Sequence, residues 1–241
     1  MNVLNFDAAI VDLDGTMVDT LDDFCVALNR MLGDLPPPYA HNQVNRADVA
    51  QWVGKGSENL IKTALAGVYI NFIQSISGAN ESPIPTTSGG PSETLFGQAW
   101  SSYQRHYLTI NGQHATVFPG VVEGLTHLKA RGLKLACLTN KPLAFAQVLL
   151  KDKGLDGFFE HTFGGDSFDR KKPDPLPLLK TCEALGTIPA RTLMLGDSSN
   201  DAQAARAAGC PVWLVTYGYN HGQPIRAVDA DGFIDSLADL G

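Results

Sequence analysis

The sequence predicts an α/β protein with a doubly wound, Rossmann-like parallel sheet and a mainly α-helical insert after the first strand. Short apolar runs without strict alternation indicate strands that are buried on both faces. Segments with helical spacing of apolar residues lie between these runs, as in repeated βα units. The stretch 17–116 breaks this rhythm, because its strand signals are weak. We therefore assign 1–16 and 117–241 to a core domain and 17–116 to the insert.

The core pattern consists of four predicted strands and the helices that separate them. The strands are expected at 8–13, 133–138, 192–195 and 212–215. Apolar residues recur at helical spacing in 121–128 and 176–185. The alanine-rich segment 201–208 stops at Gly209, a residue suited to follow the end of a helix.

The insert is predicted to hold at least three helices. An amphipathic pattern over 21–32 ends at Gly33 and a run of prolines, and Ser57 can cap a second helix that reaches Leu65. A third pattern covers 95–107. Trp52 and Trp100 fit the hydrophobic core of the insert better than a substrate contact. The segment 75–92 is rich in Ser, Gly, Pro and Thr, which predicts a mobile loop.

Composition narrows the possible partners and the compartment. The 18 lysines and arginines against 25 acidic residues give a net charge of −7, which argues against nucleic acid as the main ligand. No window offers the roughly 18 apolar residues of a membrane span, and no secretory signal is visible. Four dispersed cysteines without a C-x-x-C pair favour reduced thiols. We expect a cytoplasmic protein, with monomer and homodimer both open.

The pattern D-L-D-G-T at 12–16 directly follows the first predicted strand, at the sheet edge where ligands of α/β proteins bind. Of two carboxylates two residues apart, one can attack an electrophile, and the other can move a proton or help to hold a cation. These roles fall to Asp12 and Asp14, while Gly15 permits a tight turn. Taken alone, the pattern fits an ordinary Asp-Gly turn about equally well.

Two further motifs lie in the core domain. One follows the predicted strand 133–138, and the other precedes the predicted helix 176–185. Thr139 and Asn140 lie at the end of the run 133–138, with Pro142 suited to begin the next helix. A hydroxyl and free N–H groups there would suit phosphate oxygens, although a plain capping turn explains the motif alone. Lys172, in the pattern K-K-P-D-P, could neutralise clustered carboxylates and a phosphate. Its neighbour Lys171 fits a solvated surface lysine.

The fourth motif, G-D-S-S-N-D at 196–201, again joins a strand to a helix. Asp197 and Asp201 would offer hard oxygen ligands of the kind that Mg²⁺ prefers, although one of them could simply cap the helix. If the four loops meet in one crevice, Asp12, Asp14, Asp197 and Asp201 would repel one another strongly. The cluster makes sense only with a metal ion and a lysine, and we therefore predict a Mg²⁺ site.

These motifs, in this order, resemble the haloacid dehalogenase-like superfamily of phosphotransfer enzymes, and the helical insert resembles its C1-type cap. Within it, the chain is most similar to bacterial phosphoglycolate phosphatases. The segments that carry this closer resemblance are W-V-G-K-G at 52–56, D-P-L-P-L-L at 174–179, A-A-R-A-A-G-C-P at 204–211 and T-Y-G-Y-N at 216–220. The resemblance covers nearly the whole chain except 75–92, and it implies an insert that covers the active site.

The resemblance also implies roles for the motif residues. Asp12 would attack phosphorus to form an aspartyl-phosphate, and Asp14 would protonate the leaving alcohol and later activate water. The phosphoryl group would be held by Thr139, Asn140 and Lys172. Mg²⁺ would be bound by Asp12, the backbone carbonyl of Asp14 and Asp197, with Asp201 close by. A dehalogenase is disfavoured, because that branch lacks the second aspartate at the position of Asp14.

The loop between two insert helices, Gly54-Lys55-Gly56, would face the active site in the resembled family. Lys55 could then pair with a substrate carboxylate, or it could be a solvated lysine in a glycine turn. The segment 217–222 could border the crevice or form a structural turn. We expect a Mg²⁺-dependent phosphomonoester hydrolase, with 2-phosphoglycolate as the leading substrate. A sugar phosphomutase or sugar-phosphate phosphatase, and a non-catalytic module that binds a phosphorylated metabolite, stay as alternatives.

Overall fold

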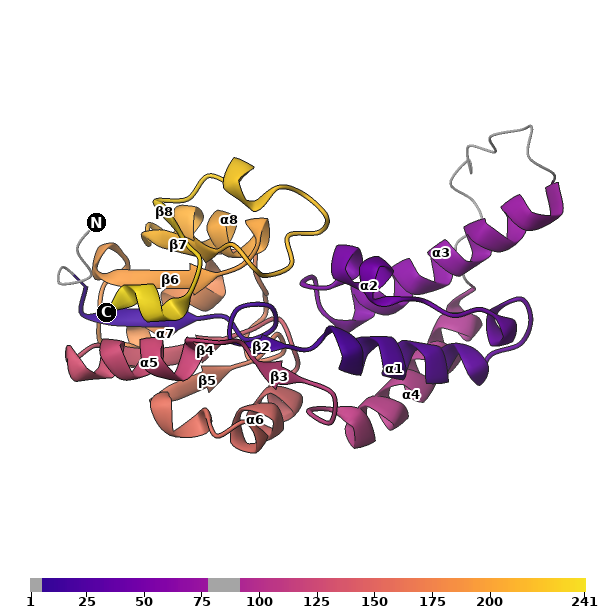
Figure 1. The fold of residues 1–241 in the computed structure, drawn as a ribbon, viewed down its shortest axis with the longest axis horizontal. Helices are drawn as coiled ribbons and strands as arrows, with labels where there is room; N and C mark the ends of the chain where they lie inside the picture. The colour runs from indigo at the N-terminus through magenta and orange to yellow at the C-terminus, as the bar shows by residue number, and fades with distance from the viewer. Residues whose placement is uncertain (1–5, 78–91) are drawn as a thin grey trace.

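The computed structural model describes residues 6–77 and 92–241. Figure 1 shows two lobes side by side: a sheet lobe that holds both ends of the chain, and a helical lobe built from α1–α4. The chain leaves the sheet lobe after the first strand of the large sheet and returns before the next strand of that sheet.

The sheet lobe contains a six-stranded parallel sheet with the order β5-β4-β1-β6-β7-β8. Its strands are β1 (Ala8–Val11), β4 (Lys134–Leu138), β5 (His161–Phe163), β6 (Thr192–Gly196), β7 (Val212–Val215) and β8 (Gly232–Ile234). Numbered along the chain, these strands stand in the 3-2-1-4-5-6 order of a Rossmann-like sheet, and the order reverses between β1 and β6. The predicted fold class is confirmed.

Helices cover both faces of this sheet. One face packs against α5 (Val121–Ala130), α6 (Leu143–Asp152) and the 3₁₀ helix η6 (Leu237–Leu240), and the other against α7 (Leu176–Leu185) and α8 (Ser199–Ala208). Within β1, Ala9 and Val11 point to the first layer, whereas Ala8 and Ile10 point to the second. Both faces are therefore dry, which explains why the strand has no polar alternation.

The helical lobe consists of α1 (Leu21–Gly33), α2 (Arg46–Trp52), α3 (Ser57–Ser77) and α4 (Glu93–Ile110), which enclose their own hydrophobic cluster. Trp52 and Trp100 pack against this cluster, as predicted. The helix α3 runs past Leu65 through Ser77, into a stretch that the sequence predicts as loop. The rest of that loop prediction, 78–91, lies outside the described residues, and Ser92 caps α4.

A short antiparallel pair joins the two lobes where the chain crosses between them. The strands β2 (Val18–Asp19) and β3 (Thr116–Val117) pair Val18 with Val117. Beside this pair, the buried carboxylate of Asp23 accepts hydrogen bonds from the backbone N–H groups of Gly112 and His114, at 2.6 and 2.8 Å. The two segments by which the chain crosses between the lobes are thus hydrogen-bonded to each other. The domain bounds 17 and 116 stay a prediction.

The remaining elements are short. They are the 3₁₀ helices η2 (Tyr39–His41), η3 (Asp156–Phe158), η4 (Pro189–Arg191) and η5 (Ile225–Ala227). The four cysteines are free thiols. Across 6–77 and 92–241, no helix combines the length and apolar character needed to cross a bilayer.

Candidate active site

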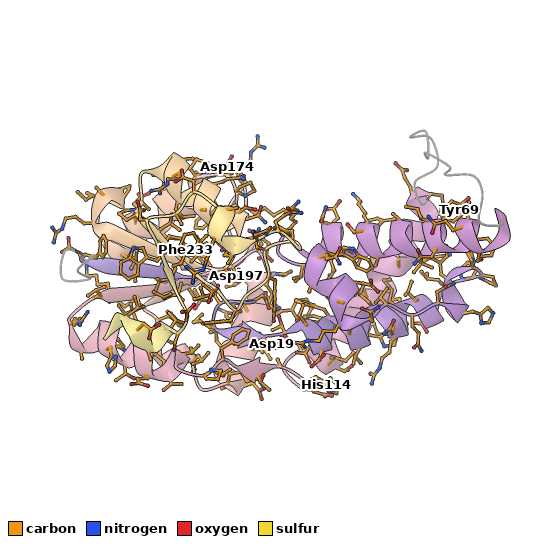
Figure 2. All side chains as sticks on the ribbon, turned by 45° about the horizontal axis from the view of Figure 1, so that its top comes forward. Asp19, Tyr69, His114, Asp174, Asp197 and Phe233 are labelled. Carbon is orange, nitrogen blue, oxygen red and sulfur yellow. The ribbon has the colours of Figure 1, made fainter. Side chains whose placement is uncertain are left out.

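A cavity lies where the carboxyl ends of β1, β4 and β6 face the helical lobe. Figure 2 shows Asp197 on the side of the sheet lobe that faces the helices, whereas Tyr69 on α3 lies far from it. The described residues that line the cavity come from both lobes. From the sheet lobe they are Asp12, Asp14, Thr139, Asn140, Lys141, Lys172, Asp197, Ser198, Asn200, Asp201 and Tyr219, and from the helical lobe Phe24, Val53, Gly54, Gly56, Ser57, Leu60 and Tyr107.

Lys172 lies at the centre of a charged cluster that it forms with Asp12 and Asp201, and its side chain is only 2% exposed. Its ammonium donates to Asp12 Oδ1 at 2.7 Å, to Asp201 Oδ1 at 2.7 Å and to the backbone carbonyl of Leu138 at 2.8 Å. All three N–H donors therefore have oxygen partners. Burial by itself disfavours the ammonium, but the charges of Asp12 and Asp201 raise the pKa of Lys172 above its ordinary value. This lysine carries a fixed positive charge into the site.

Three of the acidic side chains are close enough to share one ion. Asp12, Asp197 and Asp201 each place a carboxylate oxygen within 4.8 Å of the others. Burial, with added repulsion from Asp201 and Asp14, raises the pKa of Asp12 to about 7 against the opposing charge of Lys172. Burial and the charges of Asp201 and Asp12 also raise the pKa of Asp197. Keeping these buried carboxylates ionised therefore costs free energy, and a bound cation would reduce that cost.

The hydrogen bonds in this cluster leave oxygens free for a cation. Asp12 Oδ1 accepts from Lys172, and Asp197 Oδ2 accepts from the backbone N–H of Tyr219 at 2.5 Å. Within the described chain no donor reaches the second oxygen of either carboxylate. Asp201 is used more fully, because its Oδ2 accepts from both N–H and Oγ of Ser198 as well as from Lys172 through Oδ1. The free carboxylate oxygens fit Mg²⁺, a hard ion that prefers oxygen ligands.

Glycines make room for Asp197. Gly15 has φ +85°, and a Cβ atom there would lie 2.0 Å from Asp197 Oδ2. At Gly218, a Cβ would lie 2.2 Å from the Cβ of Asp197. Side chains at these positions would displace the carboxylate, and at Gly15 the left-handed backbone adds its own penalty. The glycine of D-L-D-G-T therefore serves the acid cluster as well as the turn.

Asp14 lies in the same cavity but has different partners from Asp12. Its Oδ1 accepts hydrogen bonds from Thr20 Oγ1 at 2.8 Å and from Lys141 Nζ at 2.7 Å. The two aspartates are thus served by different lysines, Lys172 for one and Lys141 for the other. This separation gives each carboxylate its own environment, as a division of labour between nucleophile and proton carrier requires.

Three consecutive polar residues, Thr139, Asn140 and Lys141, follow the end of β4. Thr139 Oγ1 accepts from the backbone N–H of Lys141 at 3.1 Å, and its own hydroxyl hydrogen has no acceptor in the described residues. Asn140 donates to the carbonyl of Gly54 at 3.0 Å and to that of Lys172 at 2.9 Å. Pro142 precedes α6 as its cap residue instead of forming its first turn. Thr139 is thus free to donate, whereas the amide of Asn140 is occupied.

The loop Gly54-Lys55-Gly56 is divided between two surfaces. Gly54 and Gly56 line the cavity that contains Asp12. Lys55 is exposed and lines an outer groove together with Lys171 and Asp174; this groove shares Lys172 and Asn200 with the cavity but does not include Asp12. Tyr219, from the segment 217–222, lines the cavity and donates its backbone N–H to Asp197. The structure therefore brings together every sequence-predicted site residue except Lys55.

Four acidic side chains and two lysines stand among the described residues that line the cavity. With the acids ionised, four negative charges against two positive charges leave two negative charges, which one divalent cation would balance.

Sequence reasoning did not find Lys141, Asn200, Phe24 or Tyr107 as site residues. Lys141 lies in the same motif as Thr139, but surface lysines are so common that its type carried no signal. Phe24 and Tyr107 look like ordinary core positions of their helices. Their place in the site depends on how α1 and α4 meet the sheet lobe.

Comparison with known proteins supplies relatives for this geometry. A family model described as haloacid dehalogenase-like hydrolase matches residues 6–209. A phosphoglycolate phosphatase of Thiobacillus denitrificans is 41% identical over 232 residues, 96% of this chain and 92% of the relative. One from Nitrosospira multiformis is 39% identical over 230 residues, covering 95% and 92%. The crystal structure of a predicted phosphoglycolate phosphatase from Haemophilus somnus matches with a TM-score of 0.85 and 32% identity, over 98% and 96% of the two chains.

Proposed function

The chain belongs to the haloacid dehalogenase-like hydrolases and is a phosphatase, and from this premise we propose that it hydrolyses 2-phosphoglycolate to glycolate and phosphate with Mg²⁺. One observation carries the proposal. Asp12 and Lys172 form a buried ion pair at the point where the strand order reverses, with Asp14 lining the same cavity. Asp14 carries a proton when the reaction starts. The other three acids against the two lysines then leave one negative charge, and a divalent ion would make the cavity positive by one charge, which suits a small anionic ester.

In the first step, an oxygen of Asp12 attacks phosphorus. The new bond forms an aspartyl-phosphate while the bond from phosphorus to the ester oxygen breaks. Asp14 donates a proton to the departing alkoxide, which leaves as glycolate. Thr139 donates its free hydroxyl to a phosphoryl oxygen, and Lys172 supplies positive charge beside the attacking carboxylate. Asn140 acts by holding the strand end and the loop of Gly54 in place.

In the second step, Asp14 takes a proton from a water molecule that attacks phosphorus. The phosphorus–oxygen bond to Asp12 breaks, phosphate leaves, and both carboxylates return to their starting states. The Lys141 and Thr20 contacts hold Asp14 in one orientation for both proton transfers. One carboxyl group thus serves as acid and then as base.

The free oxygens of Asp12 and Asp197 would hold Mg²⁺, with the backbone carbonyl of Asp14 and with Asp201 supporting the site. When bound, the ion supplies positive charge that offsets the carboxylates and the phosphoryl oxygens. Asp201 orients Lys172 and the backbone before α8, so its main contribution is to keep the cluster in place.

We also propose that the helical lobe, 17–116, acts as a C1-type cap that covers the cavity. Residues of this lobe, among them Phe24, Gly54 and Tyr107, form one side of the cavity. Such a cover would exclude bulk water during the first step. Cytoplasmic location stays a prediction, as does the choice between monomer and homodimer.

A panel of phosphate esters, assayed with Mg²⁺ and with EDTA, tests the proposed function. Release of free phosphate from 2-phosphoglycolate that stops with EDTA supports it. A hexose 1-phosphate that is converted to an isomer without phosphate release would instead make the protein a sugar phosphomutase. If no ester turns over but 2-phosphoglycolate binds, the result would favour a non-catalytic module that binds a phosphorylated metabolite.

A further inference from the structure

Lys141 has an environment that the proposed chemistry does not fully use. Its side chain is only 3% exposed and lines the cavity. Within the described residues its ammonium has one oxygen partner, Asp14 Oδ1 at 2.7 Å. An ammonium carries three N–H donors, so two of them have no oxygen acceptor here. A buried donor without an acceptor costs free energy unless a ligand supplies the acceptor.

Two aromatic rings from the helical lobe enclose the same ammonium. Lys141 Nζ lies 4.6 Å from the ring centroid of Phe24 on α1 and 5.3 Å from that of Tyr107 on α4. Cation–π contacts of this kind stabilise the charged lysine but leave its N–H donors without acceptors. The positive charge is therefore held at the junction of the two lobes, inside the cavity.

The hydroxyl of Tyr107 provides a second, independent sign of a missing acceptor. Tyr107 is 1% exposed and lines the cavity, and its Oη has no hydrogen-bond partner among the residues that the structure describes. Tyrosine hydroxyls usually find a partner when they are buried. Lys141 and Tyr107 thus both line the cavity and both carry buried donors without acceptors in the described chain, and the ammonium lies 5.3 Å from the centroid of the tyrosine ring.

We propose that Lys141 and Tyr107 form the subsite for the carboxylate of the substrate, so that Lys141 determines specificity for phosphorylated small acids. The inference rests on the proposed function, because it concerns the same cavity. A carboxylate offers two acceptor oxygens, which match one N–H of Lys141 and the O–H of Tyr107.

The position of Asp14 explains why a short acid fits. Asp14 protonates the ester oxygen in the proposed first step, and Lys141 is hydrogen-bonded directly to Asp14. In 2-phosphoglycolate one CH₂ group separates the ester oxygen from the carboxylate. An ammonium next to Asp14 is therefore within reach of the carboxylate of a two-carbon acid while the phosphoryl group contacts Asp12.

The alternative lysine, Lys55, has no comparable geometry. It is exposed and lines the outer groove, whose lining residues do not include Lys141 or the two rings that enclose it. A salt bridge there would be screened by solvent and worth little. The buried Lys141 can bind a carboxylate in a site from which water is largely excluded, where charge-assisted hydrogen bonds are strong.

Steady-state kinetics with two esters test the subsite: 2-phosphoglycolate, and ethyl phosphate, which has two carbons but no carboxylate. Lys141→Met should lower kcat/KM for 2-phosphoglycolate relative to ethyl phosphate by about 10- to 100-fold, mainly through KM. Lys141→Arg should restore part of this preference. Tyr107→Phe should lower the same ratio by about 3- to 10-fold, and it keeps the packing because only an unpartnered hydroxyl is lost.

Tyr103→Phe is the matched control. Tyr103 stacks on Tyr107 and also has a buried hydroxyl without a partner in the described chain, but it does not line the cavity. Its ratio for the two esters should equal that of the wild type. An unchanged ratio of the two kcat/KM values in Lys141→Met and in Tyr107→Phe would overturn the subsite. If Lys141→Met lowers both kcat/KM values equally, Lys141 only orients Asp14. Wild-type protein that turns over neither ester would refute the proposed function itself.

Discussion

The side-chain amide of Asn140 donates to the backbone carbonyl of Gly54 at 3.0 Å, and this hydrogen bond crosses from the sheet lobe to the helical lobe. Asn200 donates to the same carbonyl at 3.1 Å. Two asparagines of the sheet lobe, one just after β4 and one in the first turn of α8, therefore hold one carbonyl of the helical lobe. Because Asn140 also binds the carbonyl of Lys172, this latch is connected directly to the charged cluster.

Loss of either latch asparagine should favour opening of the helical lobe. Each substitution, Asn140→Ala or Asn200→Ala, removes one hydrogen bond to the Gly54 carbonyl, worth about 0.5–1.5 kcal/mol, and Asn140→Ala also removes the bond to the Lys172 carbonyl. The ratio of closed to open molecules should therefore fall about 2- to 10-fold, with a higher KM and faster amide hydrogen exchange in 46–56. The exposed Asn59→Ala serves as control. Equal exchange in all three variants and the wild type would show that the lobes are not held at Gly54.

Lys172 should be required for both stability and turnover. Lys172→Met leaves Asp12 and Asp201 without their shared cation, which should lower the free energy of unfolding by about 3–5 kcal/mol. The value of kcat should fall by about 10²- to 10³-fold, because a charge beside the phosphoryl group is lost. Denaturant unfolding and phosphate release measure the two effects. The exposed neighbour supplies the control: Lys171→Met should change stability by no more than about 0.5 kcal/mol.

Gly15→Ala should damage the acid cluster from the backbone side. The added Cβ would meet Asp197 Oδ2, and φ +85° is strained for alanine by about 1–3 kcal/mol. We expect weaker Mg²⁺ binding by calorimetry together with lower thermal stability. In contrast, Gly97→Ala lies on the exposed face of α4 with nothing nearby and should raise stability by about 0.5–1 kcal/mol. A Gly15→Ala protein with unchanged Mg²⁺ affinity would contradict the role assigned to Gly15.

Binding of Mg²⁺ should weaken as the pH falls. Burial raises the pKa of Asp12 to about 7 and also raises that of Asp197, so protons occupy the metal-free cluster on the acid side of neutrality. Because the ion binds ionised carboxylates, each displaced proton should lower the apparent affinity about tenfold per pH unit below the raised pKa. Calorimetry at pH 6 and pH 8 in two buffers would count the protons released. Equal affinities at both pH values would show that the free carboxylates are already ionised throughout this range.

The central strands could be predicted from sequence because both of their faces are dry. β1, β4, β6 and β7 coincide with the predicted apolar runs within a few residues. The outer strands β5 and β8 have three residues each and are partly exposed, so they carry too little pattern to detect. The seven-residue helix α2 was missed for a similar reason, although Asn45 and Asp48 form the capping box that marks its start.

The acid cluster was predictable because its residues follow strands that end at the same sheet edge. Asp12, Asp14, Thr139, Lys172, Asp197 and Asp201 line one cavity as the motifs predict. The positions of Lys55 and Lys141 could not be predicted in this way. Lys55 stands in a conspicuous glycine loop yet points to the outer groove, whereas Lys141 is buried by rings from α1 and α4. Only the packing of the helical lobe on the sheet lobe distinguishes them.

The most direct test of the account is to identify the phosphorylated residue. Wild-type protein would be mixed with Mg²⁺ and 2-phosphoglycolate labelled with ³²P, quenched in acid on the millisecond timescale and mapped by peptide. The account predicts label on the peptide that contains Asp12, appearing before free phosphate, and no label or turnover in Asp12→Asn. Phosphate release without a labelled intermediate at any time, or sustained turnover by Asp12→Asn, would contradict it.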